Sequence, residues 1–571
     1  MIKALSISLL IIFSFLEISA QKNKDKSEEL SYPDKKRFEQ NYFNGLREKT
    51  IGNYELAADY FSKALDINKQ SDEVFYELAV VNKELGKLDL ALEFIREAKT
   101  INSKNEWYLI LEADIYEGRN EYDKAAKVYE ELTKSNPDKI EYFFDFAAML
   151  LYTNKLQDAI DVYNSIEDKI GLNEDISIQK QKIYVKLDKV DKAINEAKRL
   201  VEAFPMEVRY LAMLGELYDA NERKKDAQKV YEQILEIDPD YAYARLTLAD
   251  YYKEAGKLEK SFEEIRLAFA SQGLDIDNKV RILLAYISLL DQQQYRENAL
   301  LLGKILIETH PNEAKANSIY GDVLYECGQV NEARNQYLEA VDKDNSRFII
   351  WQRIVEIDAE IDNIENLIMD SEKALEFYPN QGILYFYSGY ANIRARKYDE
   401  AISVLNSGLS VAGNNEGLKS GIYAQLGEAY HNLRKFVESD QAFENTLKLN
   451  PNDANTLNNY AYYLSLRNEK LKRAKEMSMK SNTLVPNNGS YQDTYGWILY
   501  QLKDFEGAKE WLLKAIKNGG SSSATVLEHY GDVLYQLGKV DEAFDYWIKA
   551  KENGEGTDSL VRKIADKKLY E

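Results

Sequence analysis

The chain has 571 residues and a formal net charge of −22 at pH 7, with 96 Asp and Glu against 74 Lys and Arg. This acidic balance argues against a nucleic-acid ligand and against anionic membrane surfaces, because like charges repel. The length predicts either several domains or a repeat array. Cys327 is the one cysteine of the sequence, so no internal disulfide can form.

The first residues are typical of a targeting segment. Lys3 gives a positive start, residues 4–16 form an apolar run, and Ala20 is a small residue suited to cleavage. We therefore predict a secretory signal peptide over 1–20, cleaved near Ala20; an uncleaved anchor is the alternative. No cysteine lies near the cut, so no lipidation is expected. The mature chain, without a transmembrane segment, would be periplasmic or secreted, and residues 21–37 would be a charged flexible leader.

Residues 208–241 show most clearly the pattern that recurs along the chain. A stripe of Leu211, Leu214 and Tyr218 at helical spacing is followed by a polar run and a second stripe that contains Ala227 and Tyr231. Two amphipathic helices joined by a short turn fit this pattern. A glycine inside a helix costs about 1 kcal/mol relative to alanine. We explain Gly215 by a close crossing of the two helices at Gly215 and Ala227.

The prolines show how often this unit recurs. Seven of the eight lie at or close to multiples of 34 residues apart: Pro137, Pro205, Pro239, Pro311, Pro379, Pro451 and Pro486. Proline cannot continue a helix but suits the start of the next one. A single helix pair cannot bury its outer apolar face, so the units must stack. The spacing therefore predicts an all-α solenoid.

The order Leu214-Gly215, Tyr218, Ala227, Tyr231, Pro239 resembles the tetratricopeptide repeat. This resemblance implies a right-handed α-solenoid of about fifteen helix–turn–helix repeats over 38–557. Four-residue insertions at 276–279 and 416–419 divide the array into the possible sub-blocks 38–275, 280–415 and 420–557. They are either hinges or extra helical turns.

The C-terminal end has two further motifs and a cap. The D-x-x-G-W motif at 493–497 and the E-H-x-G-D motif at 528–532 resemble the last repeats of exported bacterial tetratricopeptide proteins. Residues 558–571 are predicted to be an amphipathic capping helix. Its polar outer face would consist of Arg562, Lys563, Asp566 and Lys567.

Sites for chemistry are not evident in the sequence. His310, His431 and His529 lie far apart, without partners at metal-ligand spacing. No glycine-rich phosphate loop or nucleophile elbow occurs. No residues remain outside the array for a catalytic domain. We expect no catalytic residue, no cofactor and no metal, and a protein that is not an enzyme.

In the tetratricopeptide family the first helix of each repeat lines the concave wall, where ligands commonly bind. The residue after the small position of that helix should therefore face the groove, which would be acidic in its middle and aromatic at its far end. The predicted partner-binding residues are Glu216, Asp250, Asp322, Glu356, Glu428, Phe386, Tyr390, Tyr462, Trp497 and Tyr500. They would bind a basic, extended or helical segment of another protein. The alternative is solvated acids and packing aromatics.

These expectations favour a non-enzymatic periplasmic scaffold that mediates protein–protein interactions in cell-envelope assembly or secretion. A ligand-binding or sensory module that recognises peptide or glycan in the concave groove is the second hypothesis. The clamp that some family members use for chaperone tails is absent from the first repeats, where Tyr42, Leu46 and Glu77 occupy the relevant places.

Overall fold

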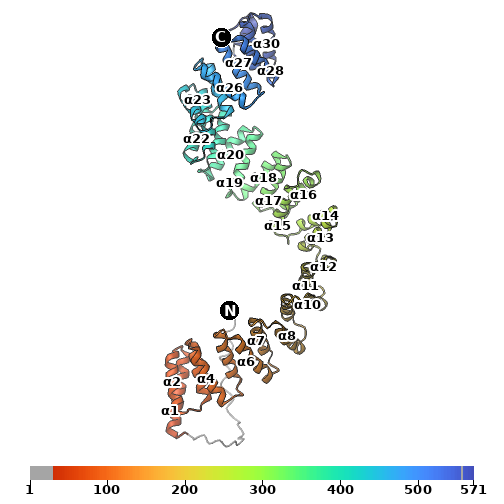
Figure 1. The fold of residues 1–571 in the computed structure, drawn as a ribbon, viewed down its shortest axis with the longest axis vertical. Coiled ribbons are helices and arrows are strands. Elements are labelled where there is room, and N and C mark those ends of the chain that lie inside the picture. The colour runs from red at the N-terminus through yellow and green to blue at the C-terminus, as the bar shows by residue number, and fades with distance from the viewer. Residues whose placement is uncertain (1–29, 555–556, 558, 571) are drawn as a thin grey trace. The chain divides into compact units, whose positions relative to one another are not determined.

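The computed structural model describes residues 30–554, 557 and 559–570. Every regular element in this described part is helical, and none is a strand (Figure 1). The predicted signal peptide at 1–20 and residues 21–29 of the predicted leader lie outside the described residues. The chain divides into two compact units, Met1–Pro239 and Asp240–Glu571.

Unit 1 contains six helix pairs. They are α1 (Tyr32–Thr50), α2 (Tyr54–Ile67), α3 (Asp72–Glu84), α4 (Leu88–Ile101), α5 (Glu106–Gly118), α6 (Tyr122–Ser135), α7 (Ile140–Tyr152), α8 (Leu156–Ile170), α9 (Glu174–Lys186), α10 (Val190–Ala203), α11 (Val208–Ala220) and α12 (Lys224–Ile237).

Unit 2 contains nine helix pairs, a short 3-10 turn η1 (Gly520–Ser522) and an end helix. The helices are α13 (Ala242–Glu254), α14 (Leu258–Ala270), α15 (Ile276–Ile287), α16 (Gln293–Thr309), α17 (Ala314–Glu326), α18 (Val330–Lys343), α19 (Phe348–Glu360), α20 (Ile364–Phe377), α21 (Gly382–Arg394), α22 (Tyr398–Val411), α23 (Glu416–Asn432), α24 (Phe436–Leu449), α25 (Ala454–Leu466), α26 (Leu471–Leu484), α27 (Gly489–Gln501), α28 (Phe505–Lys517), α29 (Ala524–Gln536), α30 (Val540–Glu552) and α31 (Leu560–Asp566).

The predicted all-α repeat architecture is confirmed, with α1–α30 as fifteen pairs and α31 as the end helix. The odd-numbered helix of each pair is its first helix, and the even-numbered one is its second. The predicted boundaries need two corrections. Helix α1 begins at Tyr32, after the N-cap Ser31, so residues 32–37 are helical rather than part of a flexible leader. The end helix covers only 560–566 of the predicted 558–571.

Both insertions are helical. Residues 276–279 form the first turn of α15, whose N-cap Asp275 accepts a hydrogen bond from the backbone N–H of Asn278. Residues 416–419 form the first turn of α23, which is 17 residues long. The division between the two compact units falls at Pro239, away from both insertions. That the insertions act as hinges stays a prediction.

The turn inside each pair follows one design, shown by the pair α11 and α12. Glu222 takes the left-handed conformation with φ of 59°. The backbone N–H of Arg223 donates to the carbonyl of Tyr218, and that of Glu222 donates to the carbonyl of Asp219, both at 2.9 Å. These two bonds form a Schellman motif, which satisfies the last carbonyls of the first helix.

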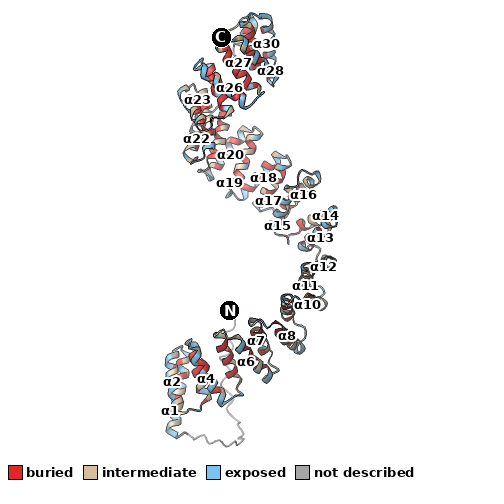
Figure 2. Cartoon of the chain, viewed as in Figure 1, coloured by how far each residue is buried: buried red, intermediate tan, exposed pale blue. Residues whose placement is uncertain are grey.

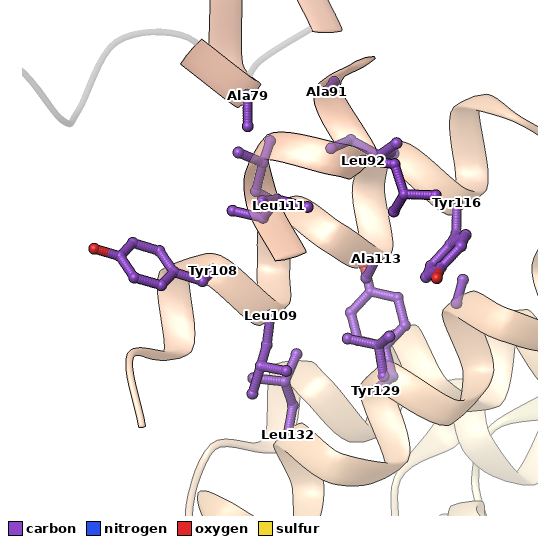
Figure 3. Close-up of a cluster of buried hydrophobic side chains, with 14 of the residues drawn as sticks. Ala79, Ala91, Leu92, Tyr108, Leu109, Leu111, Ala113, Tyr116, Tyr129 and Leu132 are labelled. Carbon is purple, nitrogen blue, oxygen red and sulfur yellow. The ribbon is translucent and has the colours of Figure 1, made fainter. Parts of the chain in front are cut away.

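Each pair closes around a small residue on its first helix. A Cβ at Gly215 would lie 2.9 Å from Cζ of Tyr231, so it is the tyrosine ring that requires the glycine. Ala227, predicted to be the crossing partner, is fully buried one turn earlier on the same helix. Figure 3 shows the alanine version in unit 1, where Ala113 lies beside the ring of Tyr129. Figure 2 shows the resulting buried faces between the helices.

Among the described helices, none combines the length and the apolar character that crossing a membrane requires.

Candidate partner-binding surface

Three successive first helices of unit 2 present equivalent positions to one cavity. Helices α25, α27 and α29 pack in sequence and carry Tyr462, Trp497 and Asp532 at the position after the small residue. All three line a cavity of about 360 Å³. The prediction that this position faces a shared surface is therefore met at the C-terminal end, and Lys563 and Tyr570 from the end of the chain complete the wall.

The aromatic residues of this cavity pack against one another. The Trp497 ring stacks on Tyr500 at a centroid distance of 4.7 Å and on His529 at 4.0 Å, with interplanar angles of 9° and 15°. Tyr500 is only 6% exposed, and Tyr462 is half-buried beside Tyr463. The indole N–H of Trp497 is buried without a hydrogen-bond partner in the described part of the chain. The cavity thus contains an unsatisfied donor but few open ring faces.

A buried charge cluster holds the end of the chain to this cavity. The Nζ atom of Lys563 lies 2.8 Å from Oε1 of Glu528 and 2.7 Å from Oδ2 of Asp532. Lys563 is 3% exposed, so its predicted place on the polar outer face of the cap is wrong. Asp532 also accepts from the indole N–H of Trp547 at 2.8 Å, and Glu528 accepts from the backbone N–H of Thr557 at 2.7 Å.

The pKa values in the cluster follow from burial and pairing. Burial raises the pKa of Asp532 even though Lys563 opposes the shift. Burial also acts to raise the pKa of Glu528, but the hydrogen bonds from Lys563 and Thr557 outweigh it and lower that pKa. The cluster is accordingly a latch that holds α31 against α29.

The other functional-looking pair of this region joins the two C-terminal motifs. Nδ1 of His529 lies 3.0 Å from Oδ1 of Asp493, and both side chains are buried. Burial alone would lower the pKa of His529, but the carboxylate of Asp493, assisted by Asp532 and Glu528, raises it. The imidazole therefore carries its charge to a higher pH than a free histidine, stacked on Trp497.

The predicted acidic residues lie on five different first helices. Glu216 is on α11 in unit 1, and Asp250, Asp322, Glu356 and Glu428 are on α13, α17, α19 and α23 in unit 2. Glu216 and Asp250 are exposed, and the other three are half-buried.

The acids of unit 2 have basic or hydroxyl neighbours. Asp322 accepts from the Tyr337 hydroxyl at 2.6 Å, and Glu356 pairs with Arg353 at 3.3 Å. Burial raises the pKa of Asp250, Asp322 and Glu428, which Lys253, Tyr337 and Arg394 respectively oppose. The positions are therefore acidic side chains with a desolvation cost that a cationic partner would relieve.

The two remaining predicted aromatics lie outside the cavity. Phe386 packs edge-on against Tyr387 at 5.5 Å. The Tyr390 hydroxyl accepts from Arg394 at 3.2 Å. Both residues are on α21 and half-buried, so the structure does not bring them together with Tyr462 and Trp497.

Metal ligation has no evident site in the described ranges, where no three His, Cys, Asp or Glu side chains are grouped to hold an ion.

The helix pairs match a known family. Two family models described as tetratricopeptide repeat match the chain, one at residues 110–171, 182–242, 213–273 and 495–555 and the other at 72–105 and 420–453. The chain is a tetratricopeptide repeat protein. The matched segments include α11 and α12, which carry the repeat pattern most clearly, and also α27 and α29 of the C-terminal cavity.

Named relatives share the repeats at low identity. A TPR repeat-containing protein of Methanocaldococcus jannaschii is 24% identical over 449 residues, which cover 72% of this chain and 70% of the relative. Human tetratricopeptide repeat protein 21A is 22% identical over 263 residues, 42% of this chain and 20% of that protein. The chain thus spans only a fifth of the human relative. The solved APC/C hetero-tetramer Cut9–Hcn1 aligns with a TM-score of 0.38 and 15% identity, over 87% of this chain and 96% of that one.

In this tetratricopeptide repeat protein, sequence reasoning missed the Lys563 latch. A signal was present: Asp493 and Glu528 stand at equivalent positions of successive first helices, 35 residues apart, where an unpaired carboxylate would be costly.

Proposed function

We propose that this chain is a non-enzymatic scaffold that binds another protein along the first helices of its repeats. The observation that carries this proposal is the series of acidic first-helix side chains in unit 2, Asp322, Glu356 and Glu428, which are half-buried yet face outward enough to meet a partner. Tetratricopeptide repeats bind other proteins, and the positions after the small residue are equivalent from one pair to the next.

A basic segment is the partner that these side chains favour. Burial raises the pKa of Asp322 and Glu428, because desolvation disfavours their charged forms. A lysine or arginine from a partner would restore the lost stabilisation of the carboxylates. Because these acids stand on separate helices, an extended or helical segment could meet several of them in turn. Such charges contribute mainly to specificity and to the rate of association.

The place of action belongs to the same proposal. Residues 1–20 have the pattern of a secretory signal, so the mature scaffold would work in the periplasm or outside the cell, in cell-envelope assembly or secretion. Capture with cross-linking from a periplasmic extract of cells that express the protein tests both points. The expected result is a stable protein partner in that fraction. Absence of any such partner there would contradict the proposal.

A ligand-binding module is the second candidate, favoured by the C-terminal cavity and by the unpaired indole N–H of Trp497. A peptide or glycan acceptor oxygen would satisfy that donor. The stacking of Trp497 on Tyr500 and His529 leaves less ring surface for a sugar. Trp497→Phe removes the N–H and keeps an aromatic ring, so this candidate predicts that binding of the peptide or oligosaccharide is lost in the variant. Unchanged binding would eliminate the donor as its basis.

A further inference from the structure

A second cavity of unit 2 lies where the repeat pattern changes length. It has a volume of about 350 Å³ and is lined by residues of α13, α14, α15 and α16 (Figure 1). Residues 276–279, the four-residue insertion, form the first turn of α15. The second helix of the same pair, α16, has 17 residues rather than the 14 of α12. The extra length therefore coincides with a cavity between two successive pairs.

The walls of this cavity are apolar and aromatic. Phe262 from α14 lies 6.5 Å from Tyr286 on α15, and Tyr286 lies 5.6 Å from Tyr295 on α16. Leu246 and Ile282 line the same space. Pockets of this size with mostly apolar walls, set between helices, are typical of small-molecule sites. Because the walls come from four helices, the cavity surrounds its occupant on several sides, which suits one compact molecule better than a long peptide segment.

The charged residues of the lining have an excess of positive charge. They are Lys253 and Arg281, both exposed, and Asp250. Arg281 contacts the side-chain oxygen of Asn278, and neither cation forms an ion pair with a carboxylate among the described residues. Burial raises the pKa of Asp250, which lessens its repulsion of a bound anion. In a chain with a net charge of −22, two cations without carboxylate partners at one apolar cavity are a distinctive combination.

We propose that this cavity binds an amphipathic anion with an apolar body and a single carboxylate, of the class of medium- and long-chain carboxylic acids. The apolar body lies against Phe262, Tyr286 and Tyr295. The carboxylate lies at the edge, where Lys253 and Arg281 supply cationic donors and Asn278 and Gln294 supply amides. The proposal is independent of protein binding along the first helices, because it needs no partner segment.

Calorimetric titration of the whole protein with dodecanoate, below its micelle concentration, tests the proposal. We expect one molecule to bind per chain, and dodecanol, which has the same body without the charge, to bind at least tenfold more weakly. The double variant Lys253→Gln/Arg281→Gln should weaken dodecanoate binding at least tenfold. The matched control Lys257→Gln/Lys304→Gln, which removes two exposed cations that do not line the cavity, should leave binding unchanged.

A steric variant separates this cavity from other sites. Ala285 is an exposed residue of the lining, so Ala285→Trp should obstruct the cavity without opening the core, and it should abolish binding. Far-UV circular dichroism melts check that each variant is folded. The proposal is overturned if dodecanoate does not bind, if dodecanol binds equally well, or if binding survives both the double variant and Ala285→Trp.

Discussion

The indole of Trp547 packs directly on the backbone of Gly531, so that a Cβ at Gly531 would lie 2.6 Å from Cδ1 of the ring. Gly531→Ala should therefore destabilise the last repeat by about 1–3 kcal/mol, the usual cost of overpacking a core. Loss of hydrogen-exchange protection in α29 and α30 would measure the effect locally, which suits a repeat array that does not unfold as one unit.

Gly417→Ala on α23 is the matched control for Gly531→Ala. A Cβ there would meet only the Asn415 side-chain oxygen, at an ordinary 3.6 Å. Helix propensity then favours alanine, so protection in α23 should stay the same or rise. Equal losses in both variants would show that the Gly531–Trp547 contact is not what requires glycine.

Lys563→Met should release the end of the chain. The substitution leaves the carboxylates of Glu528 and Asp532 buried without their cation, and breaking a buried pair in this way costs about 3–5 kcal/mol. Hydrogen exchange should show faster opening of α29 and α31. Lys568→Met, at an exposed position, is the control and should change nothing. Unaltered protection in Lys563→Met would contradict the latch.

The histidines of unit 2 should titrate in opposite directions from the ordinary value of 6.5. The Asp493 carboxylate overcomes burial and raises the pKa of His529, whereas burial lowers the pKa of His431 to about 4. Imidazole chemical shifts measured by NMR against pH should place His529 above 6.5 and His431 near 4. A midpoint for His529 below that of His431 would show that the Asp493 pairing is not formed.

The raised pKa of His529 also predicts a pH-dependent contribution to stability. Its pairing with Asp493 is fully stabilising below the unfolded pKa of about 6.5 and is lost as the pH rises through the folded pKa. The difference in melting temperature between the protein and its His529→Gln variant should therefore narrow between pH 6 and pH 9. A difference that stays constant over this interval would contradict the raised pKa.

Glu222→Gly should stabilise unit 1. Glu222 holds φ at 59°, a conformation that costs an L-residue about 1–2 kcal/mol and glycine nearly nothing. The gain should be about 1 kcal/mol after the greater freedom of glycine in the unfolded chain is subtracted. Gly256, with φ of 71°, takes the same turn position in unit 2, so Gly256→Ala should lose stability. Thermal melts of both variants measure the two effects.

The helix pairs could be predicted from sequence because the signal for them is local and repeated. Gly215, Tyr218 and Tyr231 mark apolar stripes at helical spacing, and the same frame returns every 34 residues or so. The predicted close approach at Gly215 is confirmed, but the partner is Tyr231 rather than Ala227. Spacing along one helix indicates a face, whereas the residue opposite depends on how the two helices cross.

The candidate sites were less predictable because they depend on contacts between repeats. Lys563 has the spacing of an outer-face residue, and only the position of α31 against α29 shows that it is buried with Glu528 and Asp532. The cavity lined by Asp250 likewise arises from a length change in α15 and α16, which the sequence presents as a four-residue insertion without indicating the space that it leaves.

The central claim is that acidic first-helix residues bind a basic segment of another protein, and the dissociation constant of the captured partner at two salt concentrations tests it most directly. Asp322→Asn/Glu356→Gln/Glu428→Gln is compared with the control Glu339→Gln/Glu372→Gln/Glu438→Gln, which neutralises three exposed acids on the second helices α18, α20 and α24. The first triple variant should weaken binding at least tenfold and flatten its salt dependence, while the control binds like the unaltered protein. Equal affinity and equal salt dependence in the two triple variants would contradict the claim.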